Sequence, residues 1–312
     1  MKIKTLRFDY DKEDTTRLDK FLVDCLVDIS RSKIQKLILE GFVLVDGFPV
    51  NKNGLKIVQG QSISIDLPEE GDQPLEAEDI PLDVIYIDEN AIVINKPAGM
   101  VVHPGAGNDS GTVVNAALGK WPELNSVGDP ERPGVVHRLD KETSGVLLLA
   151  RNPKAYGWFV SQFKQRKTKK AYLALVDGHP PTPEGRIEAG LHRDPKHRQR
   201  MAVALMGQGR SAITEYFRIK QFEDHDYLEV HPLSGRTHQI RVHLAYIGCP
   251  IVGDTLYGRK KSSLPLGRFF LHAQRLSICL PGEKQLTTFK SNLANDLFTQ
   301  LSQLGEQQRV DL

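Results

Sequence analysis

Hydrophobic residues near the N-terminus have the spacing of two amphipathic helices. Apolar side chains recur three and four positions apart over residues 18–26 and again over 34–38, which places them on one face of a helix in each case. Ser30 is suited to cap the second helix, and Gly41 is suited to end it. The outer face of this second helix carries three basic residues, Arg31, Lys33 and Lys36.

Short strands are predicted after these helices. Apolar residues 43–45 lead into the turn signal Asp46-Gly47, and polar and apolar residues alternate over 62–65. The pattern therefore predicts a small domain over residues 15–67. The stretch 68–81 is rich in proline and acidic residues, so we expect it to be a linker.

A larger domain with a mixed pattern is predicted over residues 82–305. Apolar runs flank a hairpin signal near residues 84–94, and residues 146–150 have the continuous apolar character of a buried strand. Further strands are predicted over 170–176, 213–219 and 227–231, and helices after Asn152 and over 237–247. Because strands outnumber helices and several are joined by hairpins, the predicted fold class is α+β, with a small N-terminal domain ahead of a mixed, largely antiparallel sheet domain.

The composition is that of a globular chain. With 312 residues, of which 40% are hydrophobic and 26% charged, the chain is long enough for two folded domains. No apolar run approaches the roughly 20 residues that a membrane helix needs, and the N-terminus lacks the apolar segment of a signal peptide. Three cysteines lie far apart in the sequence, which indicates reduced thiols. We therefore expect a cytoplasmic protein with no membrane partner.

Charge is unevenly distributed although the net charge is only +2. Residues 67–89 are acidic and contain no Lys or Arg, whereas residues 164–210 contain eleven Lys and Arg residues. A basic field of this kind suits a polyanion such as nucleic acid. A solvated charged surface is the other interpretation of the same run.

The nine residues 137–145, with the sequence HRLDKETSG, carry the strongest chemical signal. They place one carboxylate, Asp140, among basic and hydroxyl residues directly before the predicted buried strand. An acid at the edge of a buried strand is costly unless it is paired or used. Asp140 is therefore either a structural ion-pair member or a reactive group.

Three known chemistries do not fit this segment. A protein kinase loop has Asp directly after His-Arg and Asn five residues later, whereas here Leu139 intervenes and position 145 is Gly. No Gly-x-Ser-x-Gly elbow of a serine hydrolase is present. No second His or Cys pair has the spacing of metal ligands, so no metal site is predicted.

Several ordered segments resemble the RluA-type RNA pseudouridine synthases. They are NKPAGMVVHPG (95–105), HRLDKETSG (137–145), KAY (170–172), HPLSGRTHQIRVHL (231–244) and FLHA (270–273). Residues 15–67 are similar to an S4 domain, a small RNA-binding module often fused ahead of that catalytic domain. The segment VVHPGAG at 101–107, together with the S4 domain, is most similar to the D-type branch, which acts on large-subunit ribosomal RNA.

This resemblance implies an isomerase that converts uridine to pseudouridine in large-subunit ribosomal RNA, in the helix 69 stem-loop for the D-type branch. Because the product is an isomer, we expect no small-molecule cofactor, and the sequence has no Walker A loop. The expected partner is ribosomal RNA or a pre-ribosomal large-subunit particle, and the expected oligomeric state is a monomer. Other large-subunit or tRNA uridines, a non-catalytic S4-type assembly protein and a hydrolase are the alternatives.

The resemblance also implies roles for five site residues. Asp140 is the catalytic carboxylate, and Arg241 supplies the cation that keeps it ionised. Tyr172 stacks on the base and assists proton removal at C5, and Leu271 lines the uracil pocket. Arg138 enters the RNA and takes the place of the displaced base. From the sequence alone, Arg241 also fits a surface helix, and Tyr172 and Leu271 also fit the core.

The remaining candidate residues are RNA contacts. His137 either holds its loop or touches RNA, and Lys96 and Arg236 either contact phosphate or form ion pairs within loops. Residues 192–200 resemble a hairpin arm that grips phosphates, and the S4 helix face offers a second basic surface. The basic residues of these two surfaces are Arg193, Lys196, Arg198 and Arg200, and Arg31, Lys33 and Lys36.

Overall fold

The computed structural model describes residues 3–26, 29, 31–68, 75–105, 107–195, 197, 200–204 and 208–310. The chain divides into two compact units, Met1–Pro74 and Leu75–Leu312, and each is described by itself. Residues 69–74 of the predicted linker lie outside the described residues. Leu75 and Ile80 pack against the core of the second unit, and the backbone N–H of Glu78 donates to the carbonyl oxygen of Asn115 at 3.0 Å.

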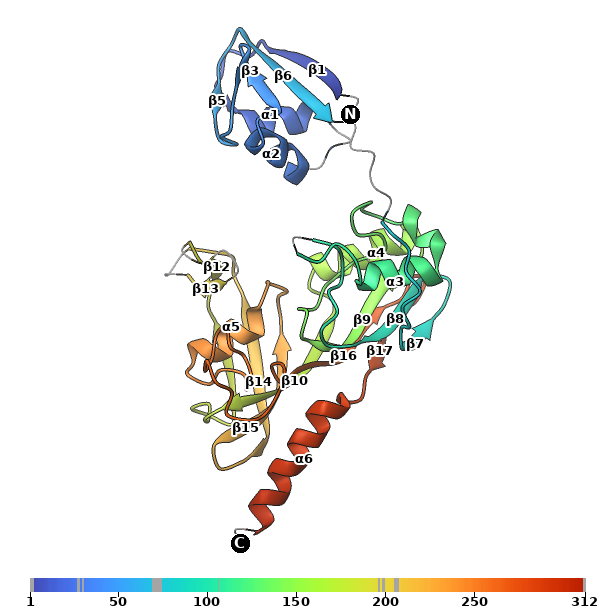
Figure 1. Cartoon of the computed structure of the whole chain (residues 1–312), viewed down its shortest axis with the longest axis vertical. Coiled ribbons are helices and arrows are strands. Elements are labelled where there is room, and N and C mark those ends of the chain that lie inside the picture. The colour runs from blue at the N-terminus through green and yellow to red at the C-terminus, as the bar shows by residue number, and fades with distance from the viewer. Residues whose placement is uncertain are drawn as a thin grey trace. The chain divides into compact units, whose positions relative to one another are not determined.

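The first unit has a four-stranded antiparallel sheet in the order β1-β6-β3-β4, a separate β2–β5 pair and two helices (Figure 1). Both predicted helices are present, and their apolar faces pack with Ile63 and Ile65 in one core. Asp46 and Gly47 both have positive φ angles, as a tight hairpin turn requires. The bounds are β1 (Ile3–Tyr10), β2 (Thr16–Arg17), α1 (Leu18–Cys25), α2 (Arg31–Leu39), β3 (Val43–Val45), β4 (Phe48–Pro49), β5 (Lys56–Ile57) and β6 (Gln61–Pro68).

Two details of this unit fall outside the sequence prediction. β1 precedes residue 15, where the small domain was expected to begin, and it pairs along its whole length with β6. The predicted N-cap, Ser30, lies outside the described residues. Gly41 follows α2 with a φ of 81°, which is the left-handed conformation that ends helices.

The second unit is built on a nine-stranded sheet in the order β11-β14-β15-β10-β16-β9-β8-β7, with β17 also paired to β16. Of the strand pairs that the structure describes, only β9 and β16 run parallel, so the prediction of a mixed, largely antiparallel sheet is confirmed. The strands are β7 (Val84–Ile87), β8 (Ala91–Lys96), β9 (Ser144–Ala150), β10 (Lys169–Asp177), β11 (Glu184–Glu188), β14 (Ile213–Gln221), β15 (His225–Pro232), β16 (Leu271–Cys279) and β17 (Leu286–Lys290).

Helices and one separate hairpin complete this unit. Asn152 caps α4 as predicted, because its side chain accepts from the backbone N–H of Ala155 at 2.9 Å. The hairpin predicted over 192–200 is formed by β12 and β13. The bounds are α3 (Val113–Lys120), η1 (Pro122–Ser126), α4 (Pro153–Lys164), β12 (Leu191–Arg193), β13 (Met201–Val203), α5 (Gln239–Tyr246) and α6 (Asn295–Val310).

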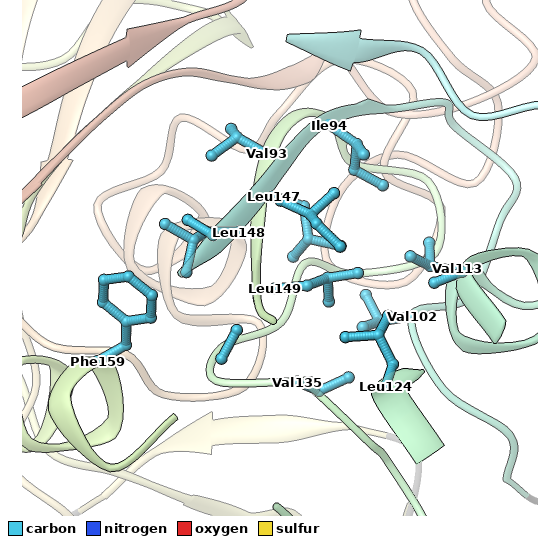
Figure 2. Packing of buried hydrophobic residues seen from close by; sticks show 14 of the residues in the cluster. Val93, Ile94, Val102, Val113, Leu124, Val135, Leu147, Leu148, Leu149 and Phe159 are labelled. Carbon is cyan, nitrogen blue, oxygen red and sulfur yellow. The ribbon is translucent and has the colours of Figure 1, made fainter. Parts of the chain in front are cut away.

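The predicted buried strand is the centre of the first half of this unit. All seven residues of β9 are buried, and their side chains alternate between two covered faces (Figure 2). Leu148 faces Phe159 of α4, whereas Leu147 and Leu149 face the side covered by α3 and η1. A strand covered on both faces has no polar face, which explains its continuous apolar sequence.

The second unit has two hydrophobic cores, one beside each half of the sheet. β10 and β16 run between the halves, and Tyr172 of β10 packs against both cores. The loop before β9 and helix α5 meet where Arg241 of α5 contacts Asp140 of that loop. Among the described residues, no helix combines the length and apolar character that a membrane span requires.

Candidate active site

The loop that carries Asp140 is fixed at both ends. Upstream, Nε2 of His137 accepts from the backbone N–H of Leu148 at 2.9 Å, and its ring stacks on Phe163. Downstream, Gly145 has a φ of 113° and lies so close to β16 that a Cβ atom would be 2.2 Å from the carbonyl oxygen of Ala273. The segment 137–145 is therefore held against the sheet at fixed positions, and Asp140 lies between them.

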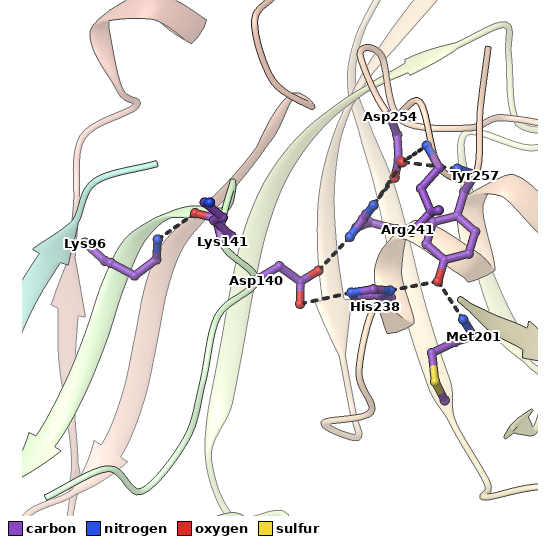
Figure 3. A network of polar contacts seen from close by, with 9 residues as sticks. Lys96, Asp140, Lys141, Met201, His238, Arg241, Asp254 and Tyr257 are labelled. Atoms are coloured by element: carbon purple, nitrogen blue, oxygen red, sulfur yellow. Dashed lines mark hydrogen bonds and ion pairs between the residues drawn. The ribbon is translucent and has the colours of Figure 1, made fainter. Parts of the chain in front are cut away.

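Arg241, 101 residues further along the chain, lies beside this acid (Figure 3). Its Nη1 donates to Oδ2 of Asp140 at 3.2 Å, while Nε and Nη2 donate to the two oxygens of Asp254 at 2.6 and 3.0 Å. Its guanidinium also lies 4.3 Å from the centre of the Phe269 ring. Arg241 is buried rather than exposed on a helix surface, so one guanidinium joins two carboxylates.

Electrostatics keep Arg241 charged. Burial opposes its charge, but the hydrogen bonds and charges of Asp254 and Asp140 outweigh that effect and raise the pKa of the guanidinium. The Asp254 side chain is 1% exposed, whereas that of Asp140 is 19% exposed. Asp254 thus holds the cation from inside, and Asp140 presents its carboxylate to solvent.

Asp140 opens into a cavity of about 510 Å³. It is the one acidic residue among the described residues that line this cavity. Six basic residues line the same cavity: Arg138, Lys164, Arg166, Lys170, Arg236 and Arg241. One carboxylate among six cations suits a polyanionic substrate that must bring one reacting group to the acid.

Tyr172 and Leu271 form the apolar part of this cavity. Leu271, at the start of β16, is 3% exposed, and Tyr172 lies on β10 next to a register shift against β16. Such bulges re-aim a side chain, often beside active sites. Burial raises the pKa of Tyr172, and the negative charge of Asp140 adds to the effect. The phenol therefore keeps its proton at neutral pH.

The structure brings most of the predicted pocket residues together. Arg138 is exposed, and it lines the cavity with Arg236 and His137. Of the two interpretations of His137, the loop-holding one fits the geometry, because its Nε2 is occupied by a backbone N–H. Burial lowers the pKa of His137 to about 3, and the charge of Lys170 adds to this.

Lys96 requires a correction. It was a candidate phosphate contact, but its side chain is completely buried at the end of β8. Its Nζ donates to the carbonyl oxygens of Pro97, Met100 and Lys141 at 2.6, 2.7 and 3.0 Å. Three acceptors match the three N–H bonds of an ammonium group, so Lys96 fastens the loops around Asp140 instead of binding RNA.

The basic residues outside the cavity are only partly described. Arg193 is exposed on β12, and Arg200, next to β13, lies 5.6 Å from the centre of the Tyr257 ring. In the first unit, Arg31 donates to buried Asp19 at 3.0 Å, while Lys36 is exposed. The predictions for Lys196, Arg198 and the side chain of Lys33 fall outside the described residues.

Sequence reasoning missed a second group of residues around the acid. Nε2 of His238 lies 4.0 Å from Oδ1 of Asp140, and its Nδ1 lies 2.7 Å from the hydroxyl of Tyr257. Asp254 and Tyr257 were not singled out at all. The segment GDTLYG at 253–258 places an acid and an aromatic residue between two glycines. This pattern was the signal in the sequence that could have pointed to Asp254 and Tyr257.

Comparison with known families matches both units. A family described as RNA pseudouridylate synthase matches residues 90–246, and a family described as S4 domain matches residues 16–63. The structure is similar to that of human RNA pseudouridylate synthase domain containing 4, with a TM-score of 0.57 and 25% identity, covering 72% of this chain and 93% of the human chain.

Curated relatives are similar over most of the chain. An uncharacterized RNA pseudouridine synthase of Aquifex aeolicus is 45% identical, covering 85% of this chain and 84% of its own length. Ribosomal large subunit pseudouridine synthase D of Neisseria meningitidis serogroup B is 38% identical, covering 95% and 80%, and that of Escherichia coli O6:H1 is 42% identical, covering 78% and 72%. The chain therefore belongs to the RNA pseudouridylate synthase family, with an S4 domain ahead of the catalytic domain.

Proposed function

We propose that this RNA pseudouridine synthase isomerises uridines of large-subunit ribosomal RNA, with Asp140 as its catalytic carboxylate. The observation that carries the proposal is the single acid of the described cavity lining, held at 3.2 Å by a buried arginine. The names of the relatives from Neisseria and Escherichia support the substrate class. The helix 69 stem-loop is the proposed site, and other large-subunit or tRNA uridines are the alternative.

The chemistry requires an ionised carboxylate. Pseudouridine forms when uracil is detached from C1′, rotated and reattached through C5. A carboxylate contributes either by attack at C1′ or by removal of the C2′ proton, and both routes need it unprotonated. Arg241 provides the positive charge beside Asp140, and Asp254 keeps that charge in place. The other five basic residues of the cavity lining suit the phosphates of the RNA.

The neighbouring side chains fit the handling of a flipped base. A uridine must leave the RNA stack to reach Asp140. Tyr172 and Leu271 offer it apolar contact, and the raised pKa of Tyr172 favours stacking over removal of the C5 proton by a phenolate. Exposed Arg138 at the cavity is placed to occupy the position that the base leaves, because its planar guanidinium both stacks and donates hydrogen bonds.

Asp140→Asn is the direct test. The substitution is nearly isosteric, so the variant is expected to fold and to bind RNA while forming no pseudouridine in ribosomal RNA. Glu142→Gln, which removes another charge from the same loop, is the control and is expected to stay active. If Asp140→Asn retains a tenth of wild-type turnover, the catalytic assignment is wrong. Pseudouridine maps of ribosomal RNA from cells with and without the gene test the site, and unchanged helix 69 uridines would exclude it.

A further inference from the structure

A chain of contacts leads from Asp140 away from Arg241. His238 lies within 4.0 Å of Asp140 through Nε2, and its Nδ1 meets the hydroxyl of Tyr257 at 2.7 Å. That hydroxyl also accepts from the backbone N–H of Met201 at 2.8 Å. Figure 3 shows the four residues in their spatial order: Asp140, His238, Tyr257 and Met201 of β13.

The hydrogen bonds define the direction of this chain. A carboxylate can only accept, so the Nε2 atom of His238 that faces Asp140 carries the ring proton. Nδ1 then accepts from the O–H of Tyr257, whose oxygen accepts in turn from Met201. A neutral imidazole that accepts at Nδ1 carries its proton on Nε2. Burial lowers the pKa of His238, although the charge of Asp140 opposes this, so the ring is neutral. Its Nε2–H therefore faces Asp140 at 4.0 Å, an electrostatic contact longer than a hydrogen bond.

The backbone of His238 has an uncommon conformation. Its φ is 55°, in the left-handed region that non-glycine residues seldom adopt, and it directly precedes α5. Strain of this kind persists where surrounding contacts hold a residue in place. Here it brings the imidazole between Asp140 and Tyr257.

Tyr257 connects the site to the basic hairpin. Its hydroxyl accepts from Met201 at the start of β13, and the guanidinium of Arg200 lies 5.6 Å from its ring centre. The guanidinium of Arg241 lies 5.0 Å from the same ring. One tyrosine thus contacts the hairpin, His238 and the arginine that pairs with Asp140.

We propose that His238 and Tyr257 are positioning residues that orient the carboxylate of Asp140 and connect it to the β12–β13 hairpin. The inference rests on Asp140 being the catalytic carboxylate. RNA that moves the hairpin would then adjust the acid through Tyr257 and His238. His238 also lines the cavity, whereas Tyr257 does not. In the proposed role both act through Asp140, so loss of either lowers the rate of the bound complex and leaves RNA affinity unchanged.

Paired variants at His238 separate positioning from folding. Asn tolerates the left-handed backbone and keeps an acceptor toward Tyr257, but it removes the donor that faces Asp140. Gln places its amide near the position of Nε2 and restores that donor. At saturating RNA, His238→Asn is expected to lower the single-turnover rate up to about tenfold, with an unchanged Kd, and His238→Gln is expected to recover most of the rate.

Tyr257→Phe tests the second link. It keeps the aromatic ring between the two arginines and removes only the hydroxyl, so we expect a loss of about tenfold in the same rate. Tyr246→Phe is the matched control, because Tyr246 is exposed on α5 and is expected to tolerate the change. Wild-type rates for His238→Asn and Tyr257→Phe beside an inactive Asp140→Asn would overturn the proposed positioning role alone, whereas an active Asp140→Asn would overturn the proposed function as well.

The connection to the hairpin is tested by a double-mutant cycle. Arg200→Gln is expected to lower the single-turnover rate at saturating RNA in the wild-type background. In the His238→Asn background the link is already broken, so Arg200→Gln is expected to have little further effect. Additive losses would show that the hairpin acts on RNA binding without reaching Asp140, and would overturn this connection.

Discussion

Asp254 holds the guanidinium of Arg241 with two hydrogen bonds, of 2.6 and 3.0 Å, and leaves Nη1 to donate to Asp140. Backbone N–H groups of Leu256 and Tyr257 donate to Asp254 in turn. The acid that faces the cavity is therefore the outer member of a three-residue network. Its geometry depends on the planar, forked shape of arginine.

Arg241→Lys is expected to abolish most turnover while the domain stays folded. A lysine ammonium is a point charge and cannot bridge two carboxylates in the same way, so Asp140 or Asp254 loses its partner. Arg241→Met leaves both unpaired and is expected to destabilise the domain by about 3–5 kcal/mol. Single-turnover assays and urea unfolding check both outcomes. A wild-type rate for Arg241→Lys would contradict the bridging role.

Gly145→Ala is expected to destabilise the catalytic domain severely. Gly145 has a φ of 113°, and a methyl group on its Cα would stand 2.2 Å from a backbone oxygen, so neither the conformation nor the space accepts a side chain. Gly157→Ala is the matched control, because Gly157 is exposed on α4 with nothing within 4 Å of its Cβ position. The control is expected to gain up to about 1 kcal/mol of unfolding free energy. Equal stability of the two variants would contradict this account.

The local sequence pattern was sufficient to predict those elements that neighbouring residues in the sequence stabilise. The continuous apolar residues of β9, the Asn152 cap and the alternation in β6 each follow from side chains within a few positions of one another. Asp140 could be singled out because a carboxylate directly before a buried strand is costly. Its partner could not, because Arg241 lies 101 residues away and reaches it only through the sheet. The resemblance to a family supplied that pair.

The sequence could not predict contacts between buried polar groups that lie far apart along the chain. A lysine in a loop motif is expected to be exposed, and the three carbonyl oxygens that surround Lys96 come from two separate loops. Asp254 and Tyr257 matter because they contact Arg241 and His238. Those contacts form only when the loop after α5 packs back against that helix. Periodicity reports which residues face a core, but it does not report which buried polar groups meet there.

His137→Gln is expected to flatten the acid dependence of stability. Burial lowers the pKa of His137 to about 3, against about 6.5 in an unfolded chain. The unfolded state therefore binds more protons below pH 6.5, and the contribution of His137 to stability, complete above that pH, is lost as the pH falls toward 3. Gln keeps an acceptor for the N–H of Leu148 and does not titrate. Unfolding free energies measured from pH 7 to pH 4 should fall less steeply in the variant, and parallel profiles would count against a neutral His137 in the folded state.

Lys36→Gln is expected to make RNA binding less dependent on salt. Lys36 is exposed on α2, and its pairing with Glu40 at 4.0 Å contributes little to stability, so the first unit should remain folded. Arg31 is less suitable, because its guanidinium helps to hold buried Asp19. If Lys36 neutralises one phosphate, the slope of log affinity against log salt becomes shallower by about 0.7–0.9. Lys12→Gln, in the loop between β1 and β2, is the control with an unchanged slope.

Deleting residues 1–74 is expected to reduce the salt slope further than Lys36→Gln does. The deletion removes the whole first unit, so every phosphate contact that this unit makes is lost together with its released counterions. Turnover on saturating short RNA should survive, because Asp140, Arg241 and the cavity lie in the second unit. Binding titrations from low to moderate salt and single-turnover assays measure the two effects separately. Equal slopes for the intact, Lys36→Gln and truncated proteins would assign RNA binding to the catalytic domain alone.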